Sequence, residues 1–222
     1  MRTAIYIDGF NLYYWLKPSP YRWVDLRALA VNAIRKPDKR HEIVAVKYFT
    51  ARVSDTQDDP SKSTRQDIYI RALLATIPEL KIFYGEFRRQ RRQMPRANYD
   101  GSVGPMQWVW DTEEKGSDVN LAVELVNDAW LNLYDTAIVV SNDSDLERAV
   151  KIVKTKGRAV GVLVRGDAEV NSLRRVSSFM IRLSSDHLAH ALLPAHIPDT
   201  SIRIPGAWAQ KETAGGVRRE RS

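Results

Sequence analysis

Four aspartates stand in patterns that suit metal-assisted chemistry. Asp8 ends the apolar run at residues 3–7, and Asp143 and Asp145 follow the apolar run at residues 136–140. Asp118 stands two residues after a glycine, at the start of a periodic apolar segment. Gathered carboxylates repel one another and raise their own pKa values, so a fold that collects them needs a cation or a shared proton. Oxygen ligands of this kind suit a hard divalent cation such as Mg²⁺.

Each aspartate also has an ordinary structural interpretation. Asp8 precedes Gly9 and fits a turn at a strand end, and Asp143 fits a helix N-cap, which is the commoner role for a single aspartate. The metal interpretation is favoured because three of the four fall at the ends of predicted central strands. We therefore interpret Asp8, Asp118, Asp143 and Asp145 as one acidic cluster.

Strand-like and helix-like segments alternate along the chain around these residues. The alternation predicts an α/β fold with a mostly parallel sheet covered by helices on both faces. The predicted strands are residues 3–7, 43–50, 81–87, 136–140, 159–164 and 179–183. The predicted helices are residues 23–34, 62–77, 117–130, 146–156, 169–176 and 186–193. One domain is expected over residues 1–194, with the acidic cluster at the carboxyl ends of its strands, where such sheets bind ligands.

Composition narrows the class of protein. With 222 residues, of which 44% are hydrophobic, the chain can bury one good core. It has no cysteine, so any metal must be held by oxygen or imidazole. The N-terminus runs directly into a predicted strand and no apolar segment approaches membrane-spanning length, so we expect a cytoplasmic protein without a membrane partner. The net charge of +7 favours an anionic partner such as nucleic acid.

Two segments depart from the alternation. Residues 88–106 contain five arginines together with Pro, Gly and Asn, which predicts a long basic hairpin or loop leading to residues 107–112. This segment is either a solvated insertion or an arm that holds a phosphate backbone, with Tyr99, Trp108 and Trp110 available to stack on bases. Trp108 and Trp110 alternate with Val109, so they fit a core face equally well. Residues 195–222 lack periodicity and are predicted to be a basic, disordered tail.

Three motifs, in order, resemble a known family. They are IYIDGFNLY, KGSDVNLAVELV and AIVVSNDSDLERAVKIVKTKGRAVGVL, and together they resemble the NYN domain, a PIN-like nuclease family that includes the bacterial LabA-like proteins. The resemblance covers most of residues 3–183. It implies a Rossmann-like three-layer α/β/α sandwich and a metal-dependent ribonuclease site. A homodimer is also expected from the resemblance alone.

Carried onto this sequence, the resemblance gives each motif residue a role. Asp8, Asp118, Asp143 and Asp145 would be both the catalytic residues and the ligands of Mg²⁺ or Mn²⁺. Asn11 and Ser141 would be nearby supporting polar groups. Glu124 falls on a different side of its predicted helix from Asp118 and is interpreted as a solvated acid. Many NYN domains have SGDSD at the third motif, where this chain has SNDSD. Asn tolerates the left-handed backbone for which Gly is used, so the turn can survive.

The sequence therefore predicts a metal-dependent enzyme that hydrolyses the phosphodiester bonds of RNA. DNA remains a further substrate to consider. Basic side chains would neutralise the substrate backbone, namely Lys115, Arg88, Arg89, Arg91 and Arg92. The main alternative is a protein of the same fold that binds RNA or another nucleic acid, or acts as an adaptor, without cleaving anything. A haloacid-dehalogenase-type phosphatase is disfavoured because the first strand ends without a DxD motif, and dinucleotide binding is disfavoured because Gly9 stands alone.

Overall fold

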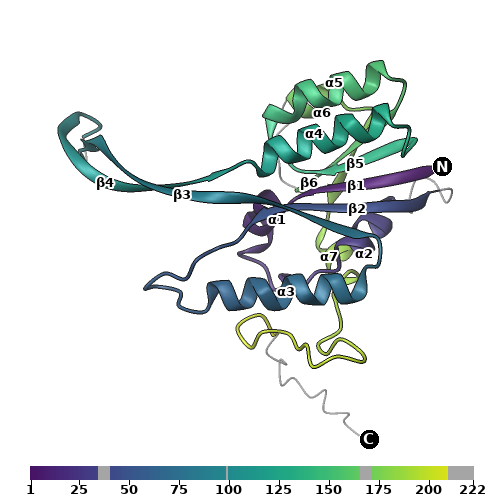
Figure 1. Ribbon diagram of the computed structural model, residues 1–222, viewed down its shortest axis with the longest axis horizontal. Coiled ribbons are helices and arrows are strands. Elements are labelled where there is room, and N and C mark those ends of the chain that lie inside the picture. The colour runs from purple at the N-terminus through teal and green to yellow at the C-terminus, as the bar shows by residue number, and fades with distance from the viewer. Residues whose placement is uncertain (35–40, 99, 166–171, 210–222) are drawn as a thin grey trace, which may run out of the picture.

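The computed structural model describes residues 1–34, 41–98, 100–165 and 172–209 as a three-layer α/β/α structure (Figure 1). The predicted α/β class with a mostly parallel central sheet is confirmed. The elements in chain order are β1 (Arg2–Asp8), α1 (Gly9–Leu16), α2 (Leu26–Ile34), β2 (Glu42–Ala51), α3 (Lys62–Thr76), β3 (Leu80–Ala97), β4 (Val103–Lys115), α4 (Ser117–Trp130), β5 (Thr136–Val140), the 3₁₀ turn η1 (Ser144–Leu146), α5 (Glu147–Thr155), β6 (Ala159–Arg165), α6 (Ser172–Val176), β7 (Phe179–Leu183) and α7 (Ser185–Ala189).

The strand order explains why one edge of the sheet is suited to a site. The order is β4-β3-β2-β1-β5-β6-β7, and every neighbouring pair is parallel except β3 with β4. The chain runs outward from β1 through β2 and β3, then crosses back to place β5 on the other side of β1. This reversal makes the carboxyl ends of β1 and β5 the topological switch point, where open α/β sheets bind their ligands.

Alternating side chains on the strands build two cores. Ile5 and Ile7 of β1 belong to a buried cluster with side chains of α1, α2 and α3. Tyr6 lies between them in sequence and points to the opposite face, where it belongs to a second cluster with residues of α4 and α5. Because successive strand residues point to opposite faces, near-continuous apolar strands give a sheet that is buried on both sides. The same division holds for β5, with Ile138 in the first cluster and Val139 in the second.

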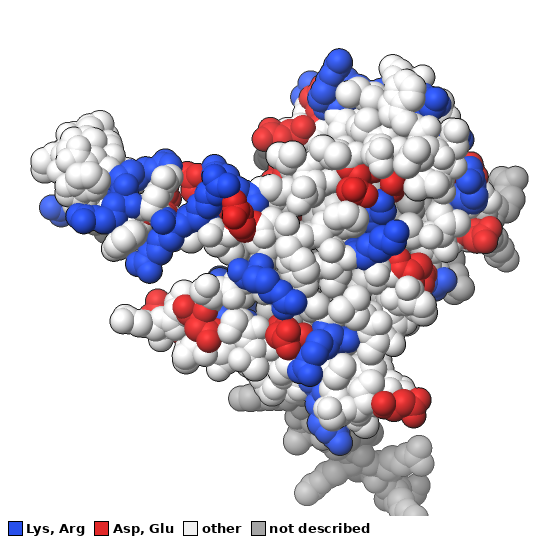
Figure 2. All heavy atoms as spheres, viewed as in Figure 1, with Lys and Arg blue, Asp and Glu red and all other residues white. Residues whose placement is uncertain are grey.

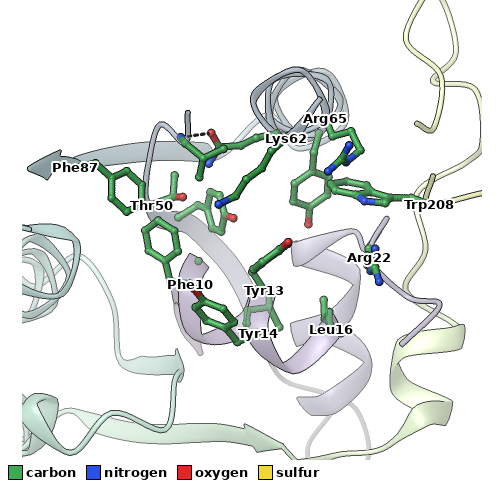
Figure 3. A pocket seen from close by; sticks show the side chains of 16 residues that line it. Phe10, Tyr13, Tyr14, Leu16, Arg22, Thr50, Lys62, Arg65, Phe87 and Trp208 are labelled. Atoms are coloured by element: carbon green, nitrogen blue, oxygen red, sulfur yellow. Dashed lines mark hydrogen bonds between the residues drawn. The ribbon is translucent and has the colours of Figure 1, made fainter. Parts of the chain in front are cut away.

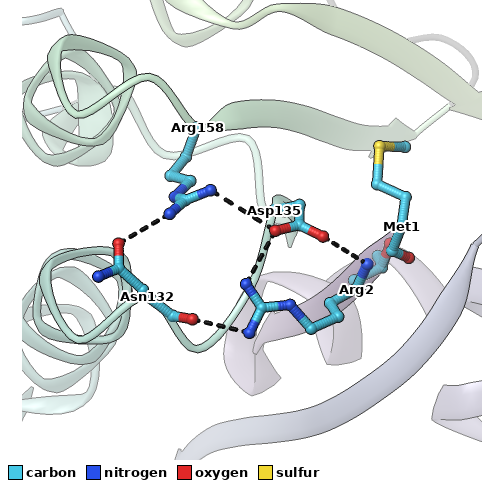
Figure 4. A network of polar contacts seen from close by, with 6 residues as sticks. Met1, Arg2, Asn132, Asp135 and Arg158 are labelled. Atoms are coloured by element: carbon cyan, nitrogen blue, oxygen red, sulfur yellow. Dashed lines mark hydrogen bonds and ion pairs between the residues drawn. The ribbon is translucent and has the colours of Figure 1, made fainter.

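A polar network fixes the end of β1 that is remote from the switch point (Figure 4). The Arg2 guanidinium donates to Asp135 Oδ1 at 2.9 Å and to the Asn132 carbonyl at 2.8 Å, and the Arg2 backbone N–H donates to Asp135 Oδ2 at 2.9 Å. Arg158 donates to Asn132 Oδ1 at 2.7 Å and lies 3.5 Å from Asp135. The hydrogen bonds from Arg2 lower the pKa of Asp135 to about 2. These contacts hold β1 beside the start of β5.

The predicted basic segment at residues 88–106 is a hairpin. Strands β3 and β4 pair in an antiparallel ladder from Glu86 with Lys115 out to Ala97 with Val103. This ladder projects well beyond the rest of the sheet (Figure 1), and we call residues 86–115 the arm. Tyr99, which was expected to stack on bases, lies outside the described residues. Pro95 lies within β3, where it is tolerated because this part of the ladder has no further strand beyond it.

Residues 195–209 correct the prediction of a disordered tail. The C-terminal segment, residues 194–209, packs against the cluster that contains α2 and α3 through Ile197, Ile202, Ile204 and Trp208. Trp23 anchors it by donating its indole N–H to the Pro194 carbonyl at 2.9 Å. The apolar side chains that hold this segment are irregularly spaced, so its sequence shows neither a helical nor a strand period. Residues 210–222 of the predicted tail lie outside the described part of the chain.

Some predicted element boundaries also differ from the structure. Helix α1 was not predicted, because its run of Tyr13, Tyr14 and Trp15 is typical of strands. The helix predicted at residues 23–34 begins only at Leu26, and of the helix predicted at residues 169–176 only α6 is described. Among the helices that the structure describes, none combines the length and apolar composition needed to cross a membrane.

Candidate metal and nucleic-acid site

Asp8 lies at the centre of the switch point. It ends β1 and caps α1, and its Oδ1 accepts the Asn11 backbone N–H at 2.9 Å. Its Oδ2 accepts the Ser141 hydroxyl at 2.9 Å. Only 4% of Asp8 is exposed. Burial raises the pKa of Asp8 and the negative charge of Asp143 raises it further, while the hydrogen bonds from Asn11 and Ser141 lower it. The pKa of Asp8 is raised overall, and the two hydrogen bonds hold its carboxyl group in place.

The residues after β5 are tied directly to Asp8. Strands β1 and β5 pair in parallel up to Ile7 with Val140, which brings the next residues, Asp8 and Ser141, side by side. The fully buried Ser141 donates to Asp8 and accepts the Asp143 backbone N–H at 3.0 Å. Asp143 in turn caps η1, and its Oδ1 accepts the Asp145 backbone N–H at 3.0 Å. One hydrogen-bonded chain therefore joins both strand ends.

Asn11 links the same two loops. Its side-chain Oδ1 accepts the backbone N–H of Asn142 at 3.4 Å, while its own backbone N–H is held by Asp8. The structure thus brings Asn11 and Ser141 next to the aspartates, where the sequence predicted them.

Asp118 joins the acidic cluster from the first turn of α4. Burial raises its pKa to about 6, and the charges of Asp8, Asp143, Glu114 and Asp145 contribute in the same direction. A negative side chain in the first turn of a helix is normally favoured by the helix dipole, so burial and the neighbouring carboxylates together outweigh that effect here. Hydrogen bonds thus join Asp8, Asp143 and Asp145 at the carboxyl ends of β1 and β5, and the charges of these residues act on Asp118.

Glu114 is a fifth carboxylate that the sequence analysis missed. It lies near the end of β4 and caps α4, accepting the Ser117 backbone N–H at 3.1 Å and the Ser117 hydroxyl at 2.8 Å. Ser117 was expected to be the cap, but Gly116 occupies that position with a φ of +98°. The sequence signal was the pair of glutamates just before the glycine of the second motif.

The donor chemistry fits a hard divalent cation, although the carboxylates are not assembled around one point. Carboxylate, hydroxyl and amide oxygens surround the switch point, which is the donor set that Mg²⁺ or Mn²⁺ takes. Within the described ranges, no three Asp, Glu or His side chains are placed so that they could hold an ion together. The expected ligand set is therefore not preassembled. One reason that the carboxylates stand apart is that Asp8 and Asp143 are held as helix caps. The other is that carboxylates without a neutralising cation repel one another.

Glu124 differs from its interpretation as a solvated acid. Its Oε2 lies 2.6 Å from Nζ of Lys47, a residue of β2 whose side chain is only 7% exposed. Lys47 also lies 2.6 Å from Asp128 of α4, and Asp128 accepts the hydroxyl of Tyr6 at 2.5 Å. Glu124 and Asp128 share a face of α4, and both contact the Lys47 side chain, so this face covers the sheet. The missing information was the buried lysine on another element.

The arm has two faces with different charge balance, because paired residues of antiparallel strands point to the same side. On one side, which we call the paired face, basic side chains meet carboxylates. These ion pairs join Arg88 to Glu86, Arg92 to Asp111 and Glu113, and Lys115 to Glu113. The expectation that Arg88, Arg92 and Lys115 bind substrate is weakened by this finding, because their charges are already offset within the protein.

The other side, which we call the open face, carries Arg89, Arg91, Trp108 and Trp110 along its outer part. The Arg89 guanidinium lies 4.6 Å from the ring centroid of Trp110, and that of Arg91 lies 5.0 Å from that of Trp108. Both indoles are 60% exposed, so they are not core residues. Among the residues that the structure describes, neither arginine has a carboxylate partner. Figure 2 shows the basic side chains along the arm, away from the body of the domain.

Comparison with known proteins gives one family, one relative by sequence and one solved structure of similar fold. The model of the NYN domain matches residues 2–184. The 6-hydroxy-3-succinoylpyridine 3-monooxygenase of Pseudomonas putida is 28% identical over 235 aligned positions, which cover 94% of this chain and 75% of the relative. The crystal structure of a protein of unknown function from Vibrio parahaemolyticus has a TM-score of 0.50 and 18% identity, covering 86% of this chain and 96% of that one. This last likeness concerns the fold alone.

Proposed function

This chain belongs to the NYN domain family, within the PIN-like nuclease superfamily, and we propose that it is a metal-dependent ribonuclease. The observation that carries the proposal is the hydrogen-bonded chain that joins Asp8, Ser141, Asp143 and Asp145 at the switch point. Burial, and after it the charges of Asp8, Asp143, Glu114 and Asp145, raise the pKa of Asp118 to about 6. Such a concentration of negative charge is costly for the folded protein. A divalent cation would relieve the repulsion and make the arrangement stable.

In the proposed site, Asp8 and Asp143 hold the ion and Asp118 and Asp145 bind a second ion or orient the attacking water. The lone pairs that Asp8 and Asp143 do not use as helix caps remain available as ligands. Ser141 and Asn11 would keep both strand ends in register at this site, since Ser141 donates to Asp8 and Asn11 accepts the Asn142 backbone N–H. When bound, Mg²⁺ or Mn²⁺ supplies activation of water and stabilisation of the leaving oxygen.

The open face of the arm supports RNA as the substrate class. Arg89 and Arg91 carry charge that no carboxylate offsets within the described residues, and the exposed Trp108 and Trp110 offer surfaces on which bases can stack. Because the arm leads through Glu114 and Gly116 directly into α4, which carries Asp118, a strand held along it would extend toward the acidic cluster. DNA would meet the same charges, so it is tested alongside RNA.

The test is cleavage of a labelled single-stranded RNA, with single-stranded DNA in parallel, by the wild type, Asp8→Asn and Asp143→Asn in Mn²⁺ or Mg²⁺. Asn retains the cap but removes the charge. We expect each variant to lose roughly a hundredfold or more of the rate, since a metal ion supplies several kcal/mol of charge stabilisation. Asp58→Asn, in the exposed loop before α3, is the matched control and should cleave like the wild type.

A contrary result would be cleavage that persists in EDTA or in both active-site variants. RNA binding without cleavage under either metal would support the nucleic-acid-binding or adaptor role instead. In that case the next activity to assay is oxygenation of a heteroaromatic acid, the chemistry in the name of the Pseudomonas relative.

A further inference from the structure

A second site lies on the other side of β1 from α4, between α1 and α3. Residues Gly9 and Phe10, which directly follow Asp8, line this pocket together with Tyr48 and Thr50 from the end of β2. The pocket therefore adjoins the acidic cluster but is formed by different side chains. In Figure 3 its residues approach from α1, α3, β2, β3 and the C-terminal segment.

Aromatic rings form the walls of this pocket. Tyr13 enters from α1, Tyr69 from α3, Phe87 from β3 and Trp208 from the C-terminal segment. Tyr69 is fixed because its hydroxyl donates to the Val24 carbonyl at 2.8 Å, and the Trp208 ring packs 5.9 Å from the Tyr69 ring. Preformed aromatic walls of this kind bind flat apolar groups through ring stacking.

Three cationic side chains line the same space: Arg22, Lys62 and Arg65. Arg65 is paired with Asp59, and Arg22 donates to the uncharged carbonyl of Lys17, so its charge is not offset by that contact. Lys62, at the start of α3, points into the pocket (Figure 3). Among the described residues its ammonium group has no hydrogen-bond or ion-pair partner. The pocket lining is therefore aromatic and carries an excess of positive charge.

The size of the cavity limits the ligand. Its volume is about 140 Å³. An apolar protein cavity of about 150 Å³ holds one benzene molecule. We propose that this pocket binds a small anion that contains one planar aromatic ring and a carboxylate or phosphate group, with Lys62 as the residue that binds the anionic group.

Two kinds of molecule could provide such a ligand. Binding of either one does not require ribonuclease activity. One is a free aromatic carboxylate, and the other is a nucleotide, whose base would occupy the ring site and whose phosphate would meet Lys62. A nucleotide bound here would lie beside the acidic cluster, because Gly9 and Phe10 belong to both surroundings. The probes that separate the two sources are nicotinate and uridine monophosphate.

The experiment is isothermal titration calorimetry of the full chain with each probe in EDTA, so that binding is measured without any metal at the acidic cluster. We compare the wild type with Lys62→Met and with Lys81→Met, an exposed lysine of β3 outside the pocket. Loss of a charge-assisted contact should weaken binding of the preferred probe about tenfold or more in Lys62→Met. Lys81→Met should bind like the wild type. Quenching of tryptophan fluorescence that disappears in Trp208→Phe would locate the ligand independently.

Each outcome decides something. Binding of nicotinate alone assigns the site to free aromatic acids, and binding of uridine monophosphate alone assigns it to nucleotides. If neither probe binds the wild type, or if Lys62→Met binds as tightly as Lys81→Met, the proposal is wrong. Because no metal is present and no cleavage is measured, failure of the ribonuclease proposal would leave this result unaffected.

Discussion

Replacing Asp118 with Asn should stabilise the folded protein near neutral pH. Burial, followed by the charges of Asp8, Asp143, Glu114 and Asp145, raises the pKa of Asp118 from 3.8 to about 6. Between these two values the folded protein binds more protons at this side chain than the unfolded chain does. The free energy of unfolding therefore falls as the pH rises through this window, and the cost is fully present above pH 6.

The size of this effect follows from the pKa difference and the exposure of the side chain. The difference between 3.8 and about 6 would correspond to at most about 3 kcal/mol if the carboxyl were buried. The carboxyl of Asp118 is partly desolvated, but the residue as a whole is exposed at the surface, so solvent screening reduces the cost to about 1 kcal/mol. For a chain of this size that free energy corresponds to a rise of roughly 2–4 °C in Tm for Asp118→Asn at pH 8. Little difference is expected at pH 4.

Thermal denaturation from pH 4 to pH 8 in EDTA measures this directly. Asp58→Asn serves as the control, because it removes an exposed aspartate outside the acidic cluster. Adding Mn²⁺ at pH 8 should then stabilise the wild type more than Asp118→Asn, because the cation relieves the same repulsion. If Asp118→Asn is no more stable than the wild type at pH 8, or gains equally at pH 4, the carboxylates do not interact as described.

Two further changes test the buried ion network and the arm. Lys47→Met should destabilise the protein by about 3–5 kcal/mol in urea denaturation, because it leaves Asp128 charged and buried without its cation; an unchanged midpoint would contradict this. The double change Arg89→Gln with Arg91→Gln should lower RNA affinity and reduce the slope of log affinity against log salt by about 1.4, from two lost phosphate contacts on a single strand. Arg88→Gln, on the paired face, should have a clearly smaller effect, and equal losses would refute the distinction between the faces.

Much of the fold was readable in the sequence because its signals are local. Short apolar runs that end in Asp8 and before Asp143 specify buried strands, and the spacing of apolar residues in α4 specifies a helix that covers them. The alternation of these segments then predicted the parallel sheet. The convergence of Asp8 and Asp143 followed, because adjacent parallel strands present their carboxyl ends at one edge.

Only the tertiary structure decided which charged side chains are paired within the protein and which remain available to bind a substrate. The arginines of the arm are alike in sequence, but the antiparallel register places Arg92 against Asp111 of the other strand and leaves Arg89 over an indole. Glu124 was taken for a solvated acid because Lys47, which pairs with it, is distant in the chain. Charge pairing between distant elements leaves no periodic trace in a sequence.

The two strand ends were specified by the sequence itself, because a strand and its terminal residue are local features. The aromatic pocket was not, because its lining comes from α1, β2, α3, β3 and the C-terminal segment, including Trp208 in a segment without any period. Trp208 packs on Tyr69 and Trp23, which lie far from it in the chain. Sites on strand ends can thus be predicted from local pattern, whereas a cavity exists only once distant side chains have packed together.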